Sequence, residues 1–147
     1  MDLEQMEPLF YTKGYHKVPT NMPQSAFYFR EENQGYIVIF VMDDRSSADI
    51  SPEWCARMKE KGIMFFRDHG KTEIHMLTLI LSESAERAKR LCSEDSFCWI
   101  IDTSISRLVI YENQVPDFYG WKEDLEQFMT DLPGCDDSQE KVSRSKR

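Results

Sequence analysis

Three aspartates follow directly after apolar stretches and have the chemistry of metal ligands. Asp43 and Asp44 come after the run YIVIFVM, and Asp102 comes after FCWII. If both runs are parallel strands, their carboxyl ends meet at the edge where open α/β sheets usually bind ligands. Carboxylate oxygens there would suit a small-molecule ligand or a divalent cation. Aspartates more often follow strands simply as turn and cap residues, so no metal is expected and the site is a hypothesis.

His75 lies within the apolar stretch EIHMLTLIL, between Ile74 and Met76. A histidine there could act as a general base, but the expected role is a half-buried side chain with a hydrogen-bond partner. No serine or cysteine has a local signature that would pair with a histidine, and the chain contains no GxSxG, P-loop or GxGxxG motif. The sequence therefore predicts neither a nucleophilic site nor a phosphate-binding loop, and no cofactor.

The four cysteines have no spacing typical of a metal site. No CxxC pair is present, and no histidine lies at a metal-ligand distance from them; they are Cys55, Cys92, Cys98 and Cys135. Because cytosolic thiols are normally reduced, we expect these residues to be free and to behave as small apolar side chains.

The elements that would position these groups alternate along the chain. Apolar runs predict five strands, at 26–30, 36–42, 73–81, 97–101 and 107–111. The first two form a hairpin around EENQG, and the last two form a hairpin around Thr103 to Ser106. The run 73–81 is nearly continuous in apolar residues, which is typical of a central strand covered on both faces.

Helical spacing of apolar residues predicts four helices. They lie within 3–10, over 52–69, after Ser82 or Ser84, and from Asp117 to Leu132. Pro8 makes the first of them short or late in starting. Ser51 as N-cap and Pro52 in the first turn mark the start of the second, and Asp117 is the expected N-cap of the last.

This order of elements predicts an α/β (α+β mixed) fold. The two helical crossovers, after Met42 and after Leu81, must join parallel strands, whereas the hairpins add antiparallel ones. We therefore expect a mixed sheet of about five strands with helices on both faces. With 147 residues, of which 41% are hydrophobic, the chain suits a single domain, which we assign to residues 1–132.

Charge is distributed unevenly along the chain. The last seven residues contain four basic and no acidic side chains, which leaves residues 1–140 with 14 basic against 26 acidic residues. An acidic body repels phosphate backbones, so nucleic-acid binding is disfavoured. The longest apolar run, Tyr36 to Met42, is far shorter than the roughly 20 residues of a membrane helix, and we expect this chain to be soluble and cytosolic.

One long stretch, TEIHMLTLILSESAERAKRLCSEDSFCWIIDTSISRLVIYENQVPDFYG, resembles a known family. It is similar to the cytosolic N-terminal domain that precedes the membrane region of certain bacterial rhomboid-family intramembrane serine proteases. The similarity runs from about Tyr15 to Leu132. Its most specific positions are Trp99, Ile100, Ile101, Asp102, Tyr111, Glu112, Asn113, Gln114, Asp117, Phe118, Tyr119 and Gly120. The resemblance attaches no catalytic role to these residues, and the role of Glu112, Asn113, Gln114 and Asp117 is unknown.

The resemblance implies a noncatalytic accessory or regulatory domain of a rhomboid-like membrane protease, held at the cytoplasmic face of the cell membrane. The family's catalytic serine and histidine belong to transmembrane helices, which this chain lacks, together with any Gly-x-Ser-Gly motif. The expected partners are the protein's own membrane domain and possible further proteins. The alternative is a free-standing small-molecule or metal-dependent enzyme that uses Asp43, Asp44 and Asp102.

The segment 133–147 has the composition of a disordered basic juxtamembrane linker. Pro133 and Gly134 stop the closing helix, and Val142 is the single apolar side chain between Asp136 and Arg147. Basic residues in such a position lie near anionic lipid on the cytoplasmic flank of a membrane helix. A solvated tail without a membrane role is the alternative interpretation.

Overall fold

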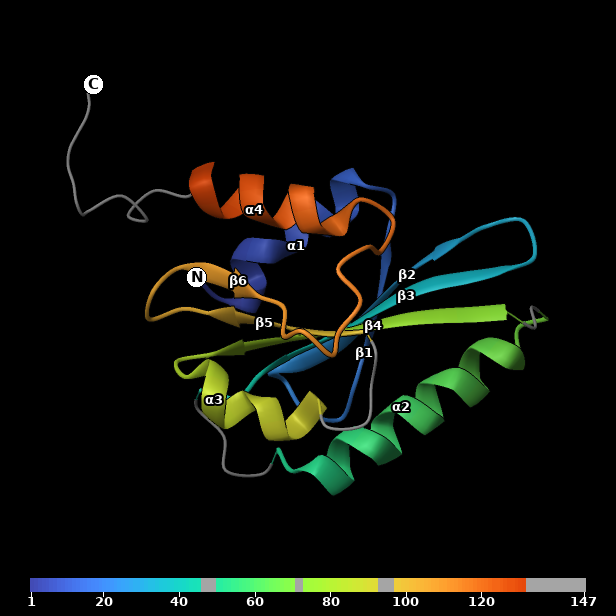
Figure 1. Cartoon of the computed structure of the whole chain (residues 1–147). Coiled ribbons are helices and arrows are strands. Elements are labelled where there is room, and N and C mark those ends of the chain that lie inside the picture. Colours follow the sequence, from blue (N-terminus) through green and yellow to red (C-terminus); the bar gives the residue numbers. More distant parts are fainter. Residues whose placement is uncertain (46–49, 71–72, 93–96, 132–147) are drawn as a thin grey trace.

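The computed structural model describes residues 1–45, 50–70, 73–92 and 97–131. In this part of the chain, six strands form one sheet and helices cover both of its faces (Figure 1). In chain order the elements are α1 (Leu3–Thr12), β1 (His16–Pro19), β2 (Ser25–Glu31), β3 (Gly35–Asp43), α2 (Pro52–Arg67), β4 (Glu73–Ser82), α3 (Ala85–Ala88), the 3-10 helix η1 (Lys89–Cys92), β5 (Cys98–Asp102), β6 (Arg107–Val109) and α4 (Trp121–Asp131).

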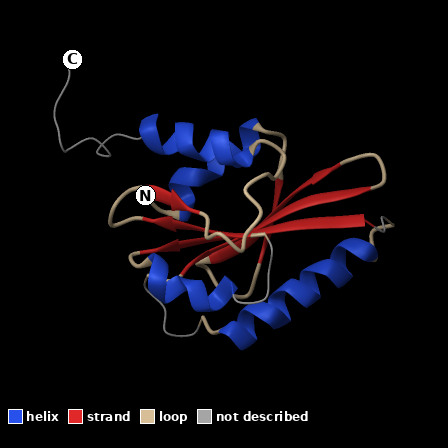
Figure 2. Cartoon of the chain, in the orientation of Figure 1, coloured by secondary structure: helices blue, strands red, loops and turns tan. Residues whose placement is uncertain are grey.

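The strands lie in the sheet in their chain order, from β1 to β6. The pairs β3–β4 and β4–β5 are parallel and are joined by helical crossovers, whereas β1–β2, β2–β3 and β5–β6 are antiparallel (Figure 2). The predicted mixed α/β class and the predicted central place of β4 are thus confirmed. Both follow from local signals, because a helix of 16 residues between two apolar runs is the usual connection of parallel strands.

One strand was not predicted. β1 pairs antiparallel with β2 at the edge of the sheet, with His16 opposite Phe29 and Pro19 opposite Ala26. Its four residues HKVP are mostly exposed, so they have no buried face that would give an apolar alternation. A short, polar, proline-containing strand is what a sheet edge tolerates.

α1 and α4 pack together on one face of the sheet, on the side that bears Leu77 and Trp99 (Figure 1). The rings of Phe10 in α1 and Trp121 in α4 have centroids 5.1 Å apart. The indole Nε1 of Trp121 donates a hydrogen bond of 3.0 Å to the hydroxyl of Tyr15, and both side chains are buried. This aromatic cluster joins the two ends of the described chain.

α2 and α3 cover the opposite face. Trp54 and Phe66 of α2 pack against the aromatic side chains of β2 and β3, and the Trp54 and Phe40 ring centroids lie 6.0 Å apart. The helix approaches the sheet closely at Gly62, where an added Cβ would lie 2.7 Å from the ring of Phe27. The position of α2 is therefore determined by large rings at its ends and a glycine between them.

α4 begins later than the sequence predicts, and Asp117 is not its N-cap. The residues before the helix form a turn in which Tyr119 (φ 52°) and Gly120 (φ 77°) adopt left-handed backbone conformations. The N–H of Trp121 donates to the carbonyl of Phe118 within this turn. Asp117 therefore remains exposed in the loop, because two successive left-handed residues cannot belong to a right-handed helix.

The prediction of four free thiols is wrong for one pair. Cys92 and Cys98 form a disulfide, with Cα atoms 5.4 Å apart. η1 ends and β5 begins side by side, and this tertiary proximity is not visible in the spacing of the two residues. Cys55 is a buried free cysteine, and Cys135 lies outside the described residues.

The described helices include none that is both long enough and apolar enough to cross a membrane. The predicted juxtamembrane linker, 133–147, lies outside the described residues, so its conformation remains a prediction.

Candidate functional site

The three predicted aspartates lie at one edge of the sheet, on either side of the end of β4. Asp43 is opposite Leu81 on β4, and Asp102 is opposite Ser82. Two strand spacings separate the flanking strands, which corresponds to about 10 Å between their backbones. The shared edge is as predicted, but each carboxylate is bound by its own neighbours.

Asp43 pairs with Arg45. Its Oδ1 accepts from the backbone N–H of Arg45 at 3.0 Å, and its Oδ2 accepts from the guanidinium at 2.6 Å. Burial opposes ionisation of Asp43, but these hydrogen bonds and the positive charge of Arg45 outweigh it, so the pKa of the carboxyl lies below its ordinary value. The carboxylate is thus neutralised by a residue of the same loop.

Asp44 is the most deeply buried of the three carboxyl groups, with a side chain that is 2% exposed. Its Oδ1 lies 3.4 Å from a guanidinium nitrogen of Arg87. Its Oδ2 is buried and has no hydrogen-bond partner. Asp44 is therefore an acceptor with remaining capacity. Among the described residues it lies beside Arg87 and belongs to no group of three side chains that could hold a metal ion.

Asp102 organises the backbone around it. Its Oδ2 accepts from the N–H of Ala85 at the start of α3, and its Oδ1 accepts from the backbone N–H and the hydroxyl of Ser104, at 3.0 and 2.6 Å. Burial opposes ionisation, yet these hydrogen bonds prevail and the pKa of Asp102 lies below its ordinary value. Throughout the described residues, no three histidine, cysteine or acidic side chains form a group that could hold a metal ion.

Replacing Asp102 by asparagine will lower the free energy of unfolding by about 1–2 kcal/mol at pH 7, because the variant loses charge-assisted hydrogen bonds. Since the folded-state pKa of Asp102 lies below its unfolded value of about 3.9, this stabilisation is complete above that value. It is lost as the pH falls through the folded-state pKa. Urea unfolding at pH 7 and at pH 3 measures it.

The difference between wild type and Asp102→Asn should therefore shrink at pH 3. Asp117→Asn removes the same charge from an exposed position and should change stability by no more than about 0.5 kcal/mol. An equal effect of Asp102→Asn at both pH values would contradict the assignment.

The most specific positions of the resemblance, which we call the signature-like residues, lie on β5 and in the loop after β6, and some of them hold this loop to the sheet. The buried Gln114 accepts a hydrogen bond from the N–H of Cys98 at 2.7 Å, and the indole of Trp99 donates to the carbonyl of Val115 at 2.9 Å. Glu112 and Asn113 are exposed. Gln114 thus has a structural role, because it binds a backbone N–H at the start of β5.

Tyr119 belongs to the same loop, but its side chain faces outward and does not hold the loop to the sheet. Its side chain is 46% exposed, and its hydroxyl forms a hydrogen bond of 2.5 Å with Nδ1 of His75 on β4. The predicted hydrogen-bond partner of His75 is therefore present. His75 is exposed rather than half-buried; its neighbours Ile74 and Met76 face α2, whereas His75 lies on the opposite face of the sheet.

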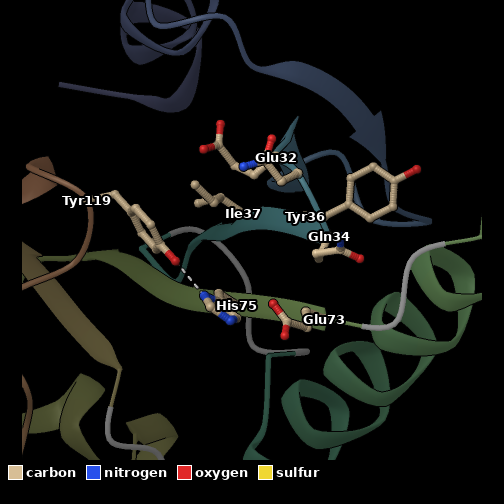
Figure 3. A pocket seen from close by; sticks show the side chains of 9 residues that line it. Glu32, Gln34, Tyr36, Ile37, Glu73, His75 and Tyr119 are labelled. Atoms are coloured by element: carbon tan, nitrogen blue, oxygen red, sulfur yellow. Dashed lines mark hydrogen bonds between the residues drawn. The ribbon is translucent and has the colours of Figure 1, made fainter.

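Two hollows meet at His75 and Tyr119, and together we call them the His75–Tyr119 groove. The first has a volume of about 200 Å³ and lies between the β2–β3 turn and β4 (Figure 3). The second has a volume of about 750 Å³ and extends along the opposite side of β4 toward Phe97 and Phe118. Both residues line both hollows, so one continuous surface crosses the first half of β4.

The His75–Tyr119 groove combines acidic and apolar groups. Glu32 and Glu73 line the first hollow and Asp117 lines the second, whereas no lysine or arginine belongs to the described lining of either. Figure 3 shows Glu32 above and Glu73 below among the lining side chains, with Tyr119 to the left and its hydroxyl directed at His75. The arrangement suits a partner that carries positive charge beside apolar side chains.

No protein-family model, curated protein or solved structure matches the chain. The resemblance to rhomboid-associated cytosolic domains therefore remains an expectation drawn from the residues, and the groove is interpreted by its chemistry.

Sequence reasoning did not identify Tyr119 or Glu73 as site residues. The sequence indicates Tyr119 only as one of the signature-like residues and Glu73 only as the start of a strand. No sequence signal marks the pairing of Tyr119 with His75, because 44 residues separate them. The contact depends on the turn at Tyr119 and Gly120, which have left-handed backbones and lie between the buried Phe118 and Trp121.

Proposed function

We propose that this chain is a noncatalytic cytosolic accessory or regulatory domain of a rhomboid-like membrane protease, and that it binds a protein partner through the His75–Tyr119 groove. The observation that carries the proposal is Tyr119. Its side chain is almost half exposed. Its left-handed backbone costs roughly 1–3 kcal/mol in strain, and such strain is typical of recognition sites. The resemblance supplies the context of a membrane protease.

The signature-like residues support this assignment in two ways. The polar side-chain groups of Gln114 and Trp99 form hydrogen bonds that hold the loop to the sheet, which makes the loop a rigid support. Tyr119 and Asp117 then project from that support into the groove. Rigid presentation of an aromatic side chain beside charged groups is typical of a binding surface, in which a few aromatic anchors contribute most of the affinity.

The experiment starts from the full-length gene and compares the parent protein with and without residues 1–131. We expect removal of the domain to change the cleavage rate of a transmembrane reporter substrate by at least about fivefold, the lower range of regulatory coupling. The purified chain alone should cleave nothing. Tyr119→Ala should reproduce most of the change, whereas Tyr119→Phe, which keeps the ring, should reproduce little of it.

Two results would contradict this proposal. One is a gene without apolar segments of about 20 residues after Arg147. The other is a parent protease whose cleavage rate is the same with and without the domain.

A second candidate function, a small-molecule or metal-dependent enzyme, is favoured by one observation. The buried Oδ2 of Asp44 has no partner, and a cation or a polar substrate group would satisfy it. Asp43 and Asp102 are already engaged by Arg45 and Ser104. The enzyme alternative would therefore require these local contacts to open when a ligand binds.

A further inference from the structure

Among the described strands, β4 has a neighbour on both sides along only half of its length. β3 pairs with β4 from Glu73 onward, but β5 pairs only with residues 78–82. Among the described residues, no strand pairs with 73–77 on the β5 side, and we call this stretch the open edge. Figure 1 shows β4 extending well beyond the start of β5.

The backbone groups at this open edge can be assigned from the bonds farther along the strand. The N–H of Thr78 donates to the carbonyl of Phe97 at 2.9 Å, whereas the carbonyl of Leu81 accepts from Asp44 on the β3 side at 3.0 Å. Because successive residues of a strand direct their N–H and C=O groups to alternate sides, even-numbered residues face β5. The N–H and C=O groups of Ile74 and Met76 thus face the open edge, and no strand among the described residues pairs with them there.

The larger hollow of the His75–Tyr119 groove lies along this edge. Ile74 and Met76 direct their side chains toward the α2 face of the sheet, where they are partly buried. His75 lies on the other face, beside Tyr119. Phe97 and Phe118 close the end of the hollow, with ring centroids 5.5 Å apart. An added strand would form hydrogen bonds with the backbone groups of Ile74 and Met76 and would contact side chains on both faces of the sheet.

We infer that the His75–Tyr119 groove binds an extended basic peptide, which adds as a strand beside residues 73–77 of β4. Unpaired strand edges are templates for this mode of recognition, in which main-chain hydrogen bonds give affinity and side-chain pockets give specificity. Five residues span about 17 Å of strand, which is enough for one short segment.

The basic character of the peptide follows from the acidic side chains of Glu73 and Asp117 in the lining; Glu32 also lines the groove but is paired with Arg30. The source of such a peptide is the cytoplasmic flank of a membrane protein, because lysine and arginine are enriched in such flanks. This source rests on the proposed function, since it requires the domain to be held at the membrane. The binding mode itself does not.

Backbone amide hydrogen exchange on the purified chain tests the inference directly. The probe is the acetylated peptide Ser-Lys-Val-Thr-Val-Lys-Val-Thr-Ser, with glutamates in place of both lysines as the matched control. In the free chain the amides of Ile74 and Met76 should exchange faster than that of Ile80, and the basic peptide should slow them by at least about tenfold. The acidic control should bind at least about tenfold more weakly.

Ile74→Pro removes the N–H that faces the open edge and leaves the bonds to β3 intact, as proline at a sheet edge allows. It should weaken peptide binding by about tenfold or more, the loss expected for one main-chain hydrogen bond and a steric block. Ile74→Ala, which keeps the N–H, is the matched control and should bind within about threefold of the wild type.

N-methylated peptides keep the test valid if Ile74→Pro does not fold. Methyl groups on alternate peptide nitrogens should abolish binding in one alternation and not in the other. Equal effects of the two alternations, or protection of Ile74 and Met76 in the free chain, would overturn the inference. Protection that increases with protein concentration would assign the edge to a second copy instead. Failure here leaves the protease comparison unaffected, so the two proposals can fail separately.

Discussion

Replacing Trp121 by alanine will lower the free energy of unfolding by about 4 kcal/mol. The side chain is fully buried at the start of α4 and packs between Phe10 and Tyr15. Its removal leaves a cavity between two helices that come from opposite ends of the described chain, and it deprives the Tyr15 hydroxyl of its donor. Urea unfolding followed by circular dichroism measures the loss.

Two controls separate the cavity from the hydrogen bond. Tyr15→Phe removes the hydroxyl and leaves the ring, so it should cost only about 1–2 kcal/mol. Trp121→Phe keeps an aromatic ring and should fall between this value and that of Trp121→Ala. If Trp121→Ala cost no more than Tyr15→Phe, the indole would not be the anchor between α1 and α4.

Replacing Gly35 by alanine will cost about 3 kcal/mol. Gly35 is opposite Glu73 at the start of the parallel β3–β4 pair, where an added Cβ would lie 2.1 Å from the carbonyl oxygen of Glu73. The clash is with backbone, which no rotamer change relieves, so the first residues of β3 and β4 must separate. Thermal and urea unfolding of the variant measure the cost.

Gly70→Ala is the matched control. At that position an added Cβ meets no atom within 4 Å, but the backbone is left-handed, with φ 96°. The expected cost is about 1–2 kcal/mol from conformation alone. A loss at Gly35 as small as that at Gly70 would mean that the strand pair adapts to a side chain.

Much of the fold could be predicted because its central elements carry strong local signals. The run YIVIFVM is apolar at every position and lies in the middle of the sheet, where both faces are covered. α2 was bounded at its start by Ser51, whose hydroxyl accepts from the N–H of Trp54 as an N-cap should. In these segments burial, periodicity and capping all indicate the same structure, so local reasoning is sufficient.

Elements at the margins of the sheet were predicted less well, for a common physical reason. β1 has no buried face, and its strand conformation depends on pairing with β2. The residues before α4 contain Asp117, a good N-cap by type, but the chain instead forms a left-handed turn at Tyr119 and Gly120, between the buried Phe118 and Trp121. Tertiary contacts override weak local preferences in both places.

The candidate site could likewise be predicted only in part from the sequence. The chain order of strands was enough to place Asp43, Asp44 and Asp102 at one edge, but local hydrogen bonds to Arg45 and Ser104 determine what two of these carboxylates do. No sequence pattern indicates the groove at the other end of β4. Its two central residues, His75 and Tyr119, meet only through the tertiary structure.

By itself, the sequence determined the mixed α/β class, the central position of β4, the crossover helix α2 and the acidic character of the body, because each depends on composition or on periodicity within one segment. Only the tertiary structure decided the disulfide between Cys92 and Cys98, the exposure of Tyr119 and the open edge at Ile74 and Met76. These features depend on where separate segments end relative to one another. Register and strand length are set by the packing of the whole sheet, and no single segment encodes them.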